Sequence, residues 1–256
     1  METDDFSIEQ ILKDGRRFMV PLYQRKYQWG DDRLVPFWDD VEAKAAEVLE
    51  GSNRFQHYMG ALILAPLGDG SQIGVTPKVQ VVDGQQRLTT FQLFLAALRE
   101  VARAYECTAI MEQVNGYLFN QMRPKDSDPL VRFKLTPTPS DRVVFHDIME
   151  KEYAGIRREY QQYYWGANVP KNTALRALRA YDLFRKWIDM FVLNGPSDSE
   201  PDTEEDEEQG EQAAVSSETV GERLDALMRA VLEQMKLVVI TLGEGDDAQV
   251  IFETLN

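Results

Sequence analysis

The sequence predicts a mixed α/β fold built around one strand, one tight turn and one helix. Residues 79–82 form a short apolar run rich in β-branched side chains, which is typical of a buried strand. Asp83 and Gly84 end this run, and from Leu88 onward apolar residues recur at helical spacing. A second apolar run, at residues 59–65, predicts a strand that pairs with the first as a hairpin.

The other elements are predicted from periodicity and capping signals. Ser7 and Gln10 form a capping-box pattern for a short first helix. A strand is expected to begin at Arg17 and to lead into an extended loop. An alternating pattern predicts a strand at residues 131–135, with Lys134 pointing outward. Further helices are predicted over residues 108–122, 172–193 and 219–234. Others are expected to begin after residue 31, at Ser140 or Asp141, and at residue 248. A last strand is predicted at 237–242.

The charge of the chain is unevenly distributed. Nine acidic residues lie within 196–211, and without them the net charge of −15 becomes −6. This acidic run predicts a disordered loop over residues 195–217. The mildly acidic remainder argues against a broad electrostatic DNA-binding surface, although it leaves room for a local basic groove.

Several classes of protein are excluded or disfavoured by what the sequence lacks. There is no apolar run of about 18 residues, so no membrane span is expected, and the acidic N-terminus does not resemble a secretory signal. A single cysteine, Cys107, rules out an internal disulfide and favours a cytoplasmic location. There is no G-x-x-x-x-G-K-[ST] phosphate loop. Because His57 and His146 are the only histidines, no nuclease centre is expected in this chain.

The turn after the central strand carries the clearest chemical signal. Asp83, Gln85, Gln86 and Arg87 lie at the start of a helix, whose N-terminal N–H groups and dipole favour anions. Gly84 permits a sharp turn and a close approach to a ligand. Arg87 offers a planar charged fork suited to phosphate. Asp83 can hold a metal ion, orient a water or receive a sugar hydroxyl. In the simpler alternative, Asp83 caps the helix and Arg87 forms a surface ion pair.

A second signal is the loop at residues 23–29. Its aromatic residues, Tyr23, Tyr27 and Trp29, are interleaved with Arg25, Lys26 and two glutamines. This combination suits stacking on a base and contact with phosphates. The alternative is a half-buried edge segment with its aromatic side chains turned inward.

Five sequence stretches together resemble one protein family. They are VPLYQRKYQW at 20–29, HYMGALIL at 57–64, DGQQRLTT at 83–90, FKLTPTPSDRVVF at 133–145 and DDAQVIFETLN at 246–256. Their sequences and order resemble the ParB-like family first catalogued as domain of unknown function 262. This family is the nucleotide-handling half of GmrSD-type and SspE-type restriction proteins.

The resemblance implies a fold and a set of site residues. The expected fold is a small ParB/sulfiredoxin-like sheet wrapped by a larger, mostly helical part. Residues 1–105 would form the nucleotide-binding core, and residues 106–256 the mainly helical part. The implied nucleotide-binding residues are Gln24, Arg25, Gly84, Arg87 and Lys134. The implied catalytic residues are Asp83, Gln85, Gln86 and Arg87, with Mg²⁺ at Asp83.

The resemblance also implies a function. The chain would bind and hydrolyse a nucleoside triphosphate, preferably GTP, and would regulate an antiphage restriction system that senses modified DNA. An HNH-type nuclease domain, following this chain or encoded separately, would cut the DNA. In the alternative, the chain is a non-enzymatic sensor that reads a phosphorothioate or a glucosylated base through Tyr23, Tyr27 and Trp29. Dimerisation through the helical part is a further option.

Overall fold

The computed structural model describes residues 2–52, 55–68, 72–164, 175–196, 215–243, 245–246 and 248–255. The described strands form one mixed sheet in the order β1-β6-β3-β4-β2-β5. They are β1 (Glu2–Ser7), β2 (Arg17–Met19), β3 (His57–Pro66), β4 (Lys78–Asp83), β5 (Leu135–Thr136) and β6 (Met235–Thr241). The mixed α/β class predicted from the sequence is therefore confirmed.

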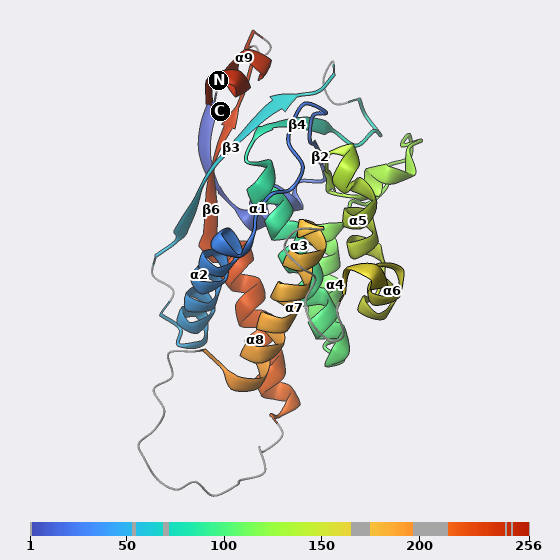
Figure 1. Ribbon diagram of the computed structural model, residues 1–256. Coiled ribbons are helices and arrows are strands. Elements are labelled where there is room, and N and C mark those ends of the chain that lie inside the picture. The colour runs from blue at the N-terminus through green and yellow to red at the C-terminus, as the bar shows by residue number, and fades with distance from the viewer. Residues whose placement is uncertain are drawn as a thin grey trace, which may run out of the picture.

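The described helices gather mainly at one end of this sheet (Figure 1). They are α1 (Ile8–Lys13), α2 (Asp31–Leu49), α3 (Gln85–Ala104), α4 (Thr108–Leu118), α5 (Pro139–Glu150), α6 (Tyr153–Glu159), α7 (Arg176–Asn194), α8 (Ser217–Arg229) and α9 (Ala248–Leu255). Short 3₁₀ turns occupy Pro129–Arg132 and Gln161–Tyr163, and a π-helical turn, Ala230–Gln234, leads from α8 into β6. None of the described helices is both long and apolar enough to cross a membrane.

The sheet joins segments from both ends of the chain. Strand β6 lies between β1, to which it is antiparallel, and β3, to which it is parallel. Strands β3 and β4 form the predicted antiparallel hairpin, and β2 runs parallel to both β4 and β5. The last strand predicted from the sequence, at 237–242, corresponds to β6, which is one of the inner strands of the sheet.

Two features of the sheet differ from the expectation. Strand β1 was not predicted, because four of its six residues are exposed and three of them are acidic, as suits an edge strand. The strand predicted over 131–135 is wrong in extent. The Asp128 side chain accepts a hydrogen bond from the N–H of Leu130 and stabilises a 3₁₀ turn there, so that only Leu135 and Thr136 pair with β2.

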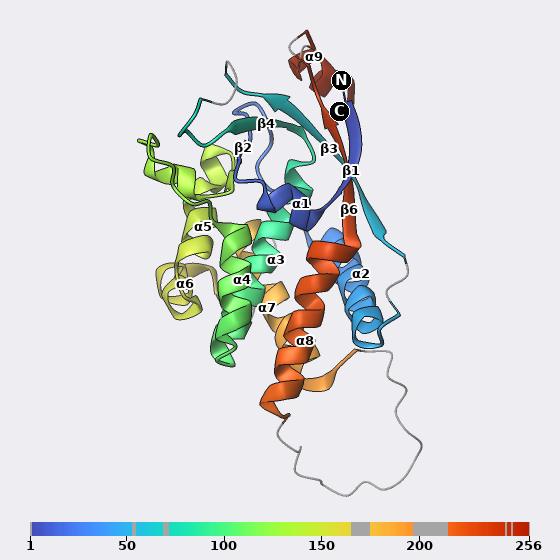
Figure 2. The ribbon, with the colours of Figure 1, turned by 180° about the vertical axis from the view of Figure 1, so that it is seen from behind.

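Helix α3 forms the centre of the helical part. Most of its residues are buried around the whole helix, as expected for a helix enclosed by others. It packs against α4, α5, α7 and α8, and the reverse view shows α4 and α8 beside it (Figure 2). Phe37 of α2 lies 5.4 Å from Phe91 of α3 and 5.4 Å from Phe184 of α7, measured between ring centroids. These contacts fix the start of α2 next to the start of α3.

The opposite face of the sheet has a smaller cover. Ile63, Ala65, Val82 and Leu242 form a separate buried cluster, against which Ala248 and Ile251 of α9 pack. The acidic residues 197–214 and the expected start of a helix at 172 lie outside the described residues. The disorder predicted over 195–217 therefore stays a prediction for 197–214, whereas Val215 packs against the core and α8 begins at Ser217.

Candidate functional site

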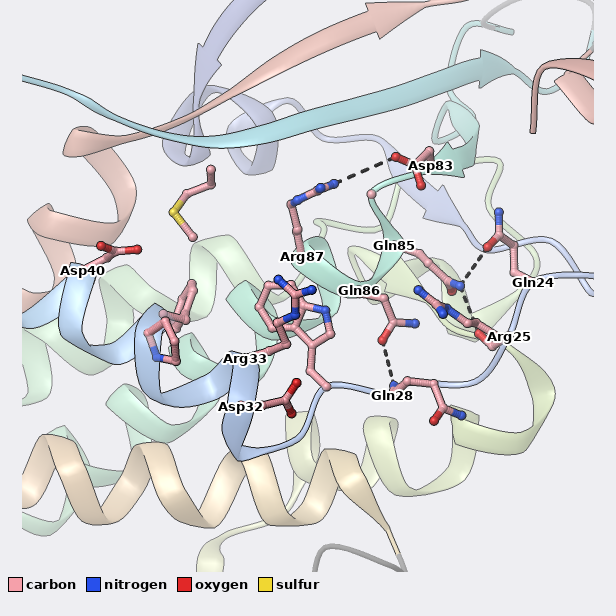
Figure 3. A pocket seen from close by; sticks show the side chains of 15 residues that line it. Gln24, Arg25, Gln28, Asp32, Arg33, Asp40, Asp83, Gln85, Gln86 and Arg87 are labelled. Atoms are coloured by element: carbon pink, nitrogen blue, oxygen red, sulfur yellow. Dashed lines mark hydrogen bonds and ion pairs between the residues drawn. The ribbon is translucent and has the colours of Figure 1, made fainter. Parts of the chain in front are cut away.

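A cavity of about 580 Å³ lies where strand β4 passes into helix α3. Four segments line it: the loop before α2, one face of α2, strand β3 at Met59, and the turn from Asp83 to Arg87 (Figure 3). Of the residues singled out from the sequence, the cavity brings together eight: Gln24, Arg25, Trp29, Asp83, Gly84, Gln85, Gln86 and Arg87.

The backbone of Gly84 shapes the turn. Its φ of +92° lies in the left-handed region, and a Cβ at this position would come within 2.9 Å of the carbonyl oxygen of Ala61. Gly84 is also the N-cap of α3, and among the described residues no side chain caps the first turn of the helix. The alternative in which Asp83 caps α3 is therefore wrong. The first-turn N–H groups of α3 lie at the cavity, where they favour an anion.

Arg87 is held against strand β3. Its Nη1 donates a hydrogen bond of 2.9 Å to the carbonyl oxygen of Ala61 and lies 3.9 Å from Oδ2 of Asp83. A Cβ on Gly60 would come within 3.0 to 3.1 Å of the guanidinium. The glycine inside β3 therefore leaves room for the arginine. Gly60 was not among the predicted site residues, although a glycine within an apolar strand is a known sign of such a close approach.

The two glutamines of the turn hold the neighbouring loop. Nε2 of Gln85 donates to Oε1 of Gln24 at 2.8 Å and to the carbonyl oxygen of Arg25 at 3.0 Å. Gln86 bonds the same loop twice: Nε2 donates to the carbonyl oxygen of Lys26 at 3.2 Å, and Oε1 accepts from the N–H of Gln28 at 2.7 Å. Both glutamines are more than nine-tenths buried. Their side-chain amides therefore bind the protein itself.

The aromatic residues of the loop separate into three environments. Trp29 is half-buried and lines the cavity. Tyr23 lies outside the cavity, 48% exposed, and its hydroxyl accepts a hydrogen bond from Gln80. Tyr27 is only 4% exposed, and its hydroxyl lies 2.8 Å from Oγ1 of Thr90; burial raises the pKa of Tyr27. The expected stacking of Tyr27 on a base is contradicted, because neither face of its ring is accessible.

Helix α2 contributes residues that sequence reasoning missed. Asp32, Pro36 and Asp40 recur at intervals of four, and Arg33 and Phe37 follow the first two, so all five lie on one face of the helix. The apolar stripe of this helix was read as core, and Phe37 does belong to the core. The polar residues that repeat every four positions beside that stripe were the sequence signal that could have identified this face of α2 as part of the site.

Helix α7 fixes the junction between the loop and α2. Arg179 forms a bidentate ion pair with Asp31, with Nε at 2.7 Å from Oδ1, and Arg176 donates to the carbonyl oxygen of Gln28. The bond from Arg179 lowers the pKa of Asp31. The part of the cavity formed by Trp29 and Asp32 is thus attached to the second half of the chain.

Comparison with known proteins supplies the family. The family model of the GmrSD restriction endonuclease N-terminal domain matches residues 8–256. The chain belongs to this family. No curated protein matches it. The predicted resemblance to GmrSD-type proteins is therefore confirmed.

Lys134 lies elsewhere in this GmrSD N-terminal domain. It does not line the cavity, and it is 3% exposed, so the prediction that it points outward is wrong. Its carbonyl oxygen accepts a hydrogen bond from the N–H of Phe18, which places its backbone beside β2. Burial lowers the pKa of Lys134 to about 8. Lys134 therefore does not belong to this cavity, and its predicted role in nucleotide binding stays a prediction.

The cavity of the GmrSD N-terminal domain balances its charges. Arg25, Arg33 and Arg87 face Asp32, Asp40 and Asp83 around it. Within the described residues, no group of three or more histidine, cysteine or acidic side chains could hold a metal ion. Mg²⁺, however, is usually held by one or two carboxylates together with substrate phosphates. Asp83 fits that mode of binding, in which a triphosphate supplies the remaining ligands.

Proposed function

We propose that this chain is a nucleotide-binding and nucleotide-hydrolysing regulatory domain of a restriction system. The observation that carries the proposal is the meeting of three arginines, from the loop, α2 and α3, around one cavity at the uncapped N-terminus of α3. Cationic forks and helix N–H groups are the donors that phosphates require. Half-buried Trp29 adds a flat apolar surface of the kind on which a base stacks.

The residues of the turn have distinct proposed roles. Arg87 and the first N–H groups of α3 bind the phosphates, and Arg25 approaches them from the loop. Gln85 and Gln86 act as positioning residues, because their amides hold the loop that carries Arg25 and Trp29. Asp83 orients the attacking water or holds Mg²⁺. The ion, when bound, would offset the charge of the phosphates, as phosphoryl transfer generally requires.

The regulatory part of the proposal rests on the family. Its members are the N-terminal domains of GmrSD restriction endonucleases. We infer that nucleotide binding or hydrolysis in this ParB-like domain, stimulated by modified DNA, controls a nuclease carried elsewhere in the system. The chain would act in the cytoplasm, where it would meet both nucleotide and phage DNA.

One observation favours a second function. Leu22, Tyr23, Arg25 and Lys26 are all exposed on the same loop, so apolar, aromatic and cationic groups are available together. This surface suits the alternative of a non-enzymatic sensor of modified DNA, in which Tyr23, exposed on this loop, contacts the modified feature. A mobility-shift assay that compares phosphorothioate or glucosylated duplex with plain duplex tests it. Equal, weak binding to both would contradict sensing by this chain.

The first test of the main proposal is phosphate release from ATP, GTP, CTP and UTP with Mg²⁺, together with nucleotide binding. We expect Arg87→Ala to weaken binding by about 10-fold to 100-fold, as the loss of a charged hydrogen-bonding group generally does. Exposed Arg158 lies on α6, outside the cavity, and Arg158→Ala is the matched control. Unchanged affinity in Arg87→Ala would refute the assignment of the phosphate site.

A further inference from the structure

The cavity has two chemically different ends. Figure 3 shows Asp83, Gln24 and Arg25 at one end and Asp40 at the other, with Arg87 and Arg33 between them. The first end holds the start of α3 and suits phosphates. We propose that Asp40 is the specificity-determining residue for the base, and that it selects guanine. This inference rests on the proposed function, since it assumes that a nucleotide occupies the cavity.

The position of Asp40 follows from the geometry of α2. Asp32 and Asp40 lie on one helix face, eight residues apart, which corresponds to about 12 Å along the axis. Helix α2 therefore extends the cavity away from the turn between β4 and α3. A nucleotide with its phosphates at the start of α3 could therefore place its base beside Asp40.

Apolar groups line the cavity next to Asp40. Pro36 and Phe37 precede it by one turn of α2, and Met59 of β3 also lines this cavity. Phe37 is 2% exposed and is fixed by its contacts with Phe91 and Phe184. Rigid apolar walls of this kind accept a flat ring and add little binding energy for a charged group.

The carboxylate of Asp40 is accessible. Its Oδ2 lies 3.2 Å from Nε2 of His57, and its side chain is 39% exposed. Among the described residues no partner is found for Oδ1. An ionised carboxylate only accepts hydrogen bonds, and its two oxygens can accept from two donors at once.

Guanine is the base that matches this pattern. It presents two adjacent donors, N1–H and the N2 amine, to a facing carboxylate. Adenine and cytosine present a ring nitrogen acceptor at the equivalent position, which a carboxylate repels. Uracil presents one imino N–H between two carbonyl oxygens. We therefore expect the order GTP, then UTP, then ATP and CTP, because the Asp40 carboxylate meets two donors on guanine, one on uracil and a ring acceptor on adenine and cytosine.

The test compares ligands that share phosphates but differ in the base. Binding of GTP, UTP, ATP, xanthosine triphosphate and inorganic triphosphate is measured for the unmodified chain and for Asp40→Asn. Exposed Asp39 does not line the cavity, so Asp39→Asn is the matched control for the loss of one negative charge. Circular dichroism and the unfolding midpoint establish that both variants fold.

We expect Asp40→Asn to weaken GTP binding by about 10-fold to 100-fold and to strengthen xanthosine triphosphate binding. The gain has a physical reason: xanthine carries a carbonyl where guanine carries its amine, and an asparagine amide can donate to that oxygen. Inorganic triphosphate binding should stay unchanged. An equal loss for every nucleotide, or no change for any, would overturn the role of Asp40. Failure of the unmodified chain to bind inorganic triphosphate or any nucleotide would instead overturn the proposed function, and this inference with it.

Discussion

The floor and the rim of the cavity are built in different ways. The floor is the turn from Asp83 to Arg87, and its shape comes from the backbone of Gly84 and its contact with Ala61 of β3. The rim is the loop from Gln24 to Gly30 with the first turn of α2. Distant side chains hold it in place, because its partners lie 58 to 61 residues away in the turn and 148 residues away in α7.

This difference changes the interpretation of the motif DGQQR, residues 83–87. The sequence suggested a single catalytic unit, but the residues of the motif shape different parts of the cavity. Gly84 and Arg87 belong to the floor, whereas Gln85 and Gln86 extend their amides into the rim. A substitution in the floor should therefore damage the fold locally, and a substitution of a glutamine should loosen a loop.

The largest effect is expected from Gly84→Ala, which tests whether the floor depends on one backbone conformation. A non-glycine residue at positive φ costs about 1–3 kcal/mol. The added Cβ would also approach the carbonyl oxygen of Ala61 to 2.9 Å. We expect a loss of unfolding free energy of at least this size in denaturant titrations.

The control for this substitution is Gly116→Ala. Gly116 is exposed in α4, and a Cβ there would meet nothing within 4 Å. Because alanine favours a helix, the unfolding free energy of this variant should rise by about 0.5–1 kcal/mol. A Gly84→Ala variant as stable as the original chain would show that the floor can relax, and would remove the contrast with the rim.

A smaller effect is expected from Gln86→Glu, which tests whether the glutamine acts through the rim. One oxygen of the glutamate can still accept from the N–H of Gln28, but the other would face the carbonyl oxygen of Lys26 with no proton between them. Two opposed acceptors in a buried place cost about 1–3 kcal/mol. Unfolding titrations measure this cost.

Ligand binding adds a second measurement on the same variant. If the rim carries Arg25 and Trp29, then Gln86→Glu should weaken the binding of every nucleotide by a similar factor, because all nucleotides would contact the same loop. Gln161→Glu, at an exposed position in a 3₁₀ turn, is the matched control for the added charge. Full stability and full affinity in Gln86→Glu would contradict the assignment of Gln86 to the rim.

The contrast between floor and rim also explains what the sequence could predict. The strand, the turn and the helix of the floor were predicted from local patterns, since apolar periodicity and Gly84 are visible within about ten residues. The capping box of Ser7 and Gln10 was predicted for the same reason and is present. Local signals of this kind do not depend on the rest of the fold.

The rim was only partly predicted, because its contacts join distant segments. Arg25 and Trp29, which the sequence singled out, do line the cavity, but the burial of Tyr27 depends on Thr90 in α3. Nothing in the sequence near Asp40 indicates that β3 will lie opposite it. Lys134 was misplaced because alternation suggested a strand, whereas the Asp128 cap shortened that strand to two residues.

The smallest effect is expected at the ion pair between Asp31 and Arg179, which attaches the rim to α7. The Asp31 side chain is 44% exposed, so solvent screens the pair, and a double-mutant cycle with alanine should give a coupling of about 0.5–1 kcal/mol. The exposed pair between Asp225 and Arg229 in α8, 3.9 Å apart, is the control and should give less. Arg179→Ala should also weaken nucleotide binding slightly, whereas Arg229→Ala should not.

The pH dependence of this coupling has a definite sign. Because Arg179 lowers the pKa of Asp31 in the folded chain, the coupling is fully present above the unfolded pKa of about 3.9 and is lost as the pH falls through the folded value. An NMR titration of the Asp31 carboxyl group measures this directly, and its pKa should rise in Arg179→Ala. An unchanged pKa would show that the pair does not hold the rim, and the attachment would then depend on Arg176 and the carbonyl oxygen of Gln28.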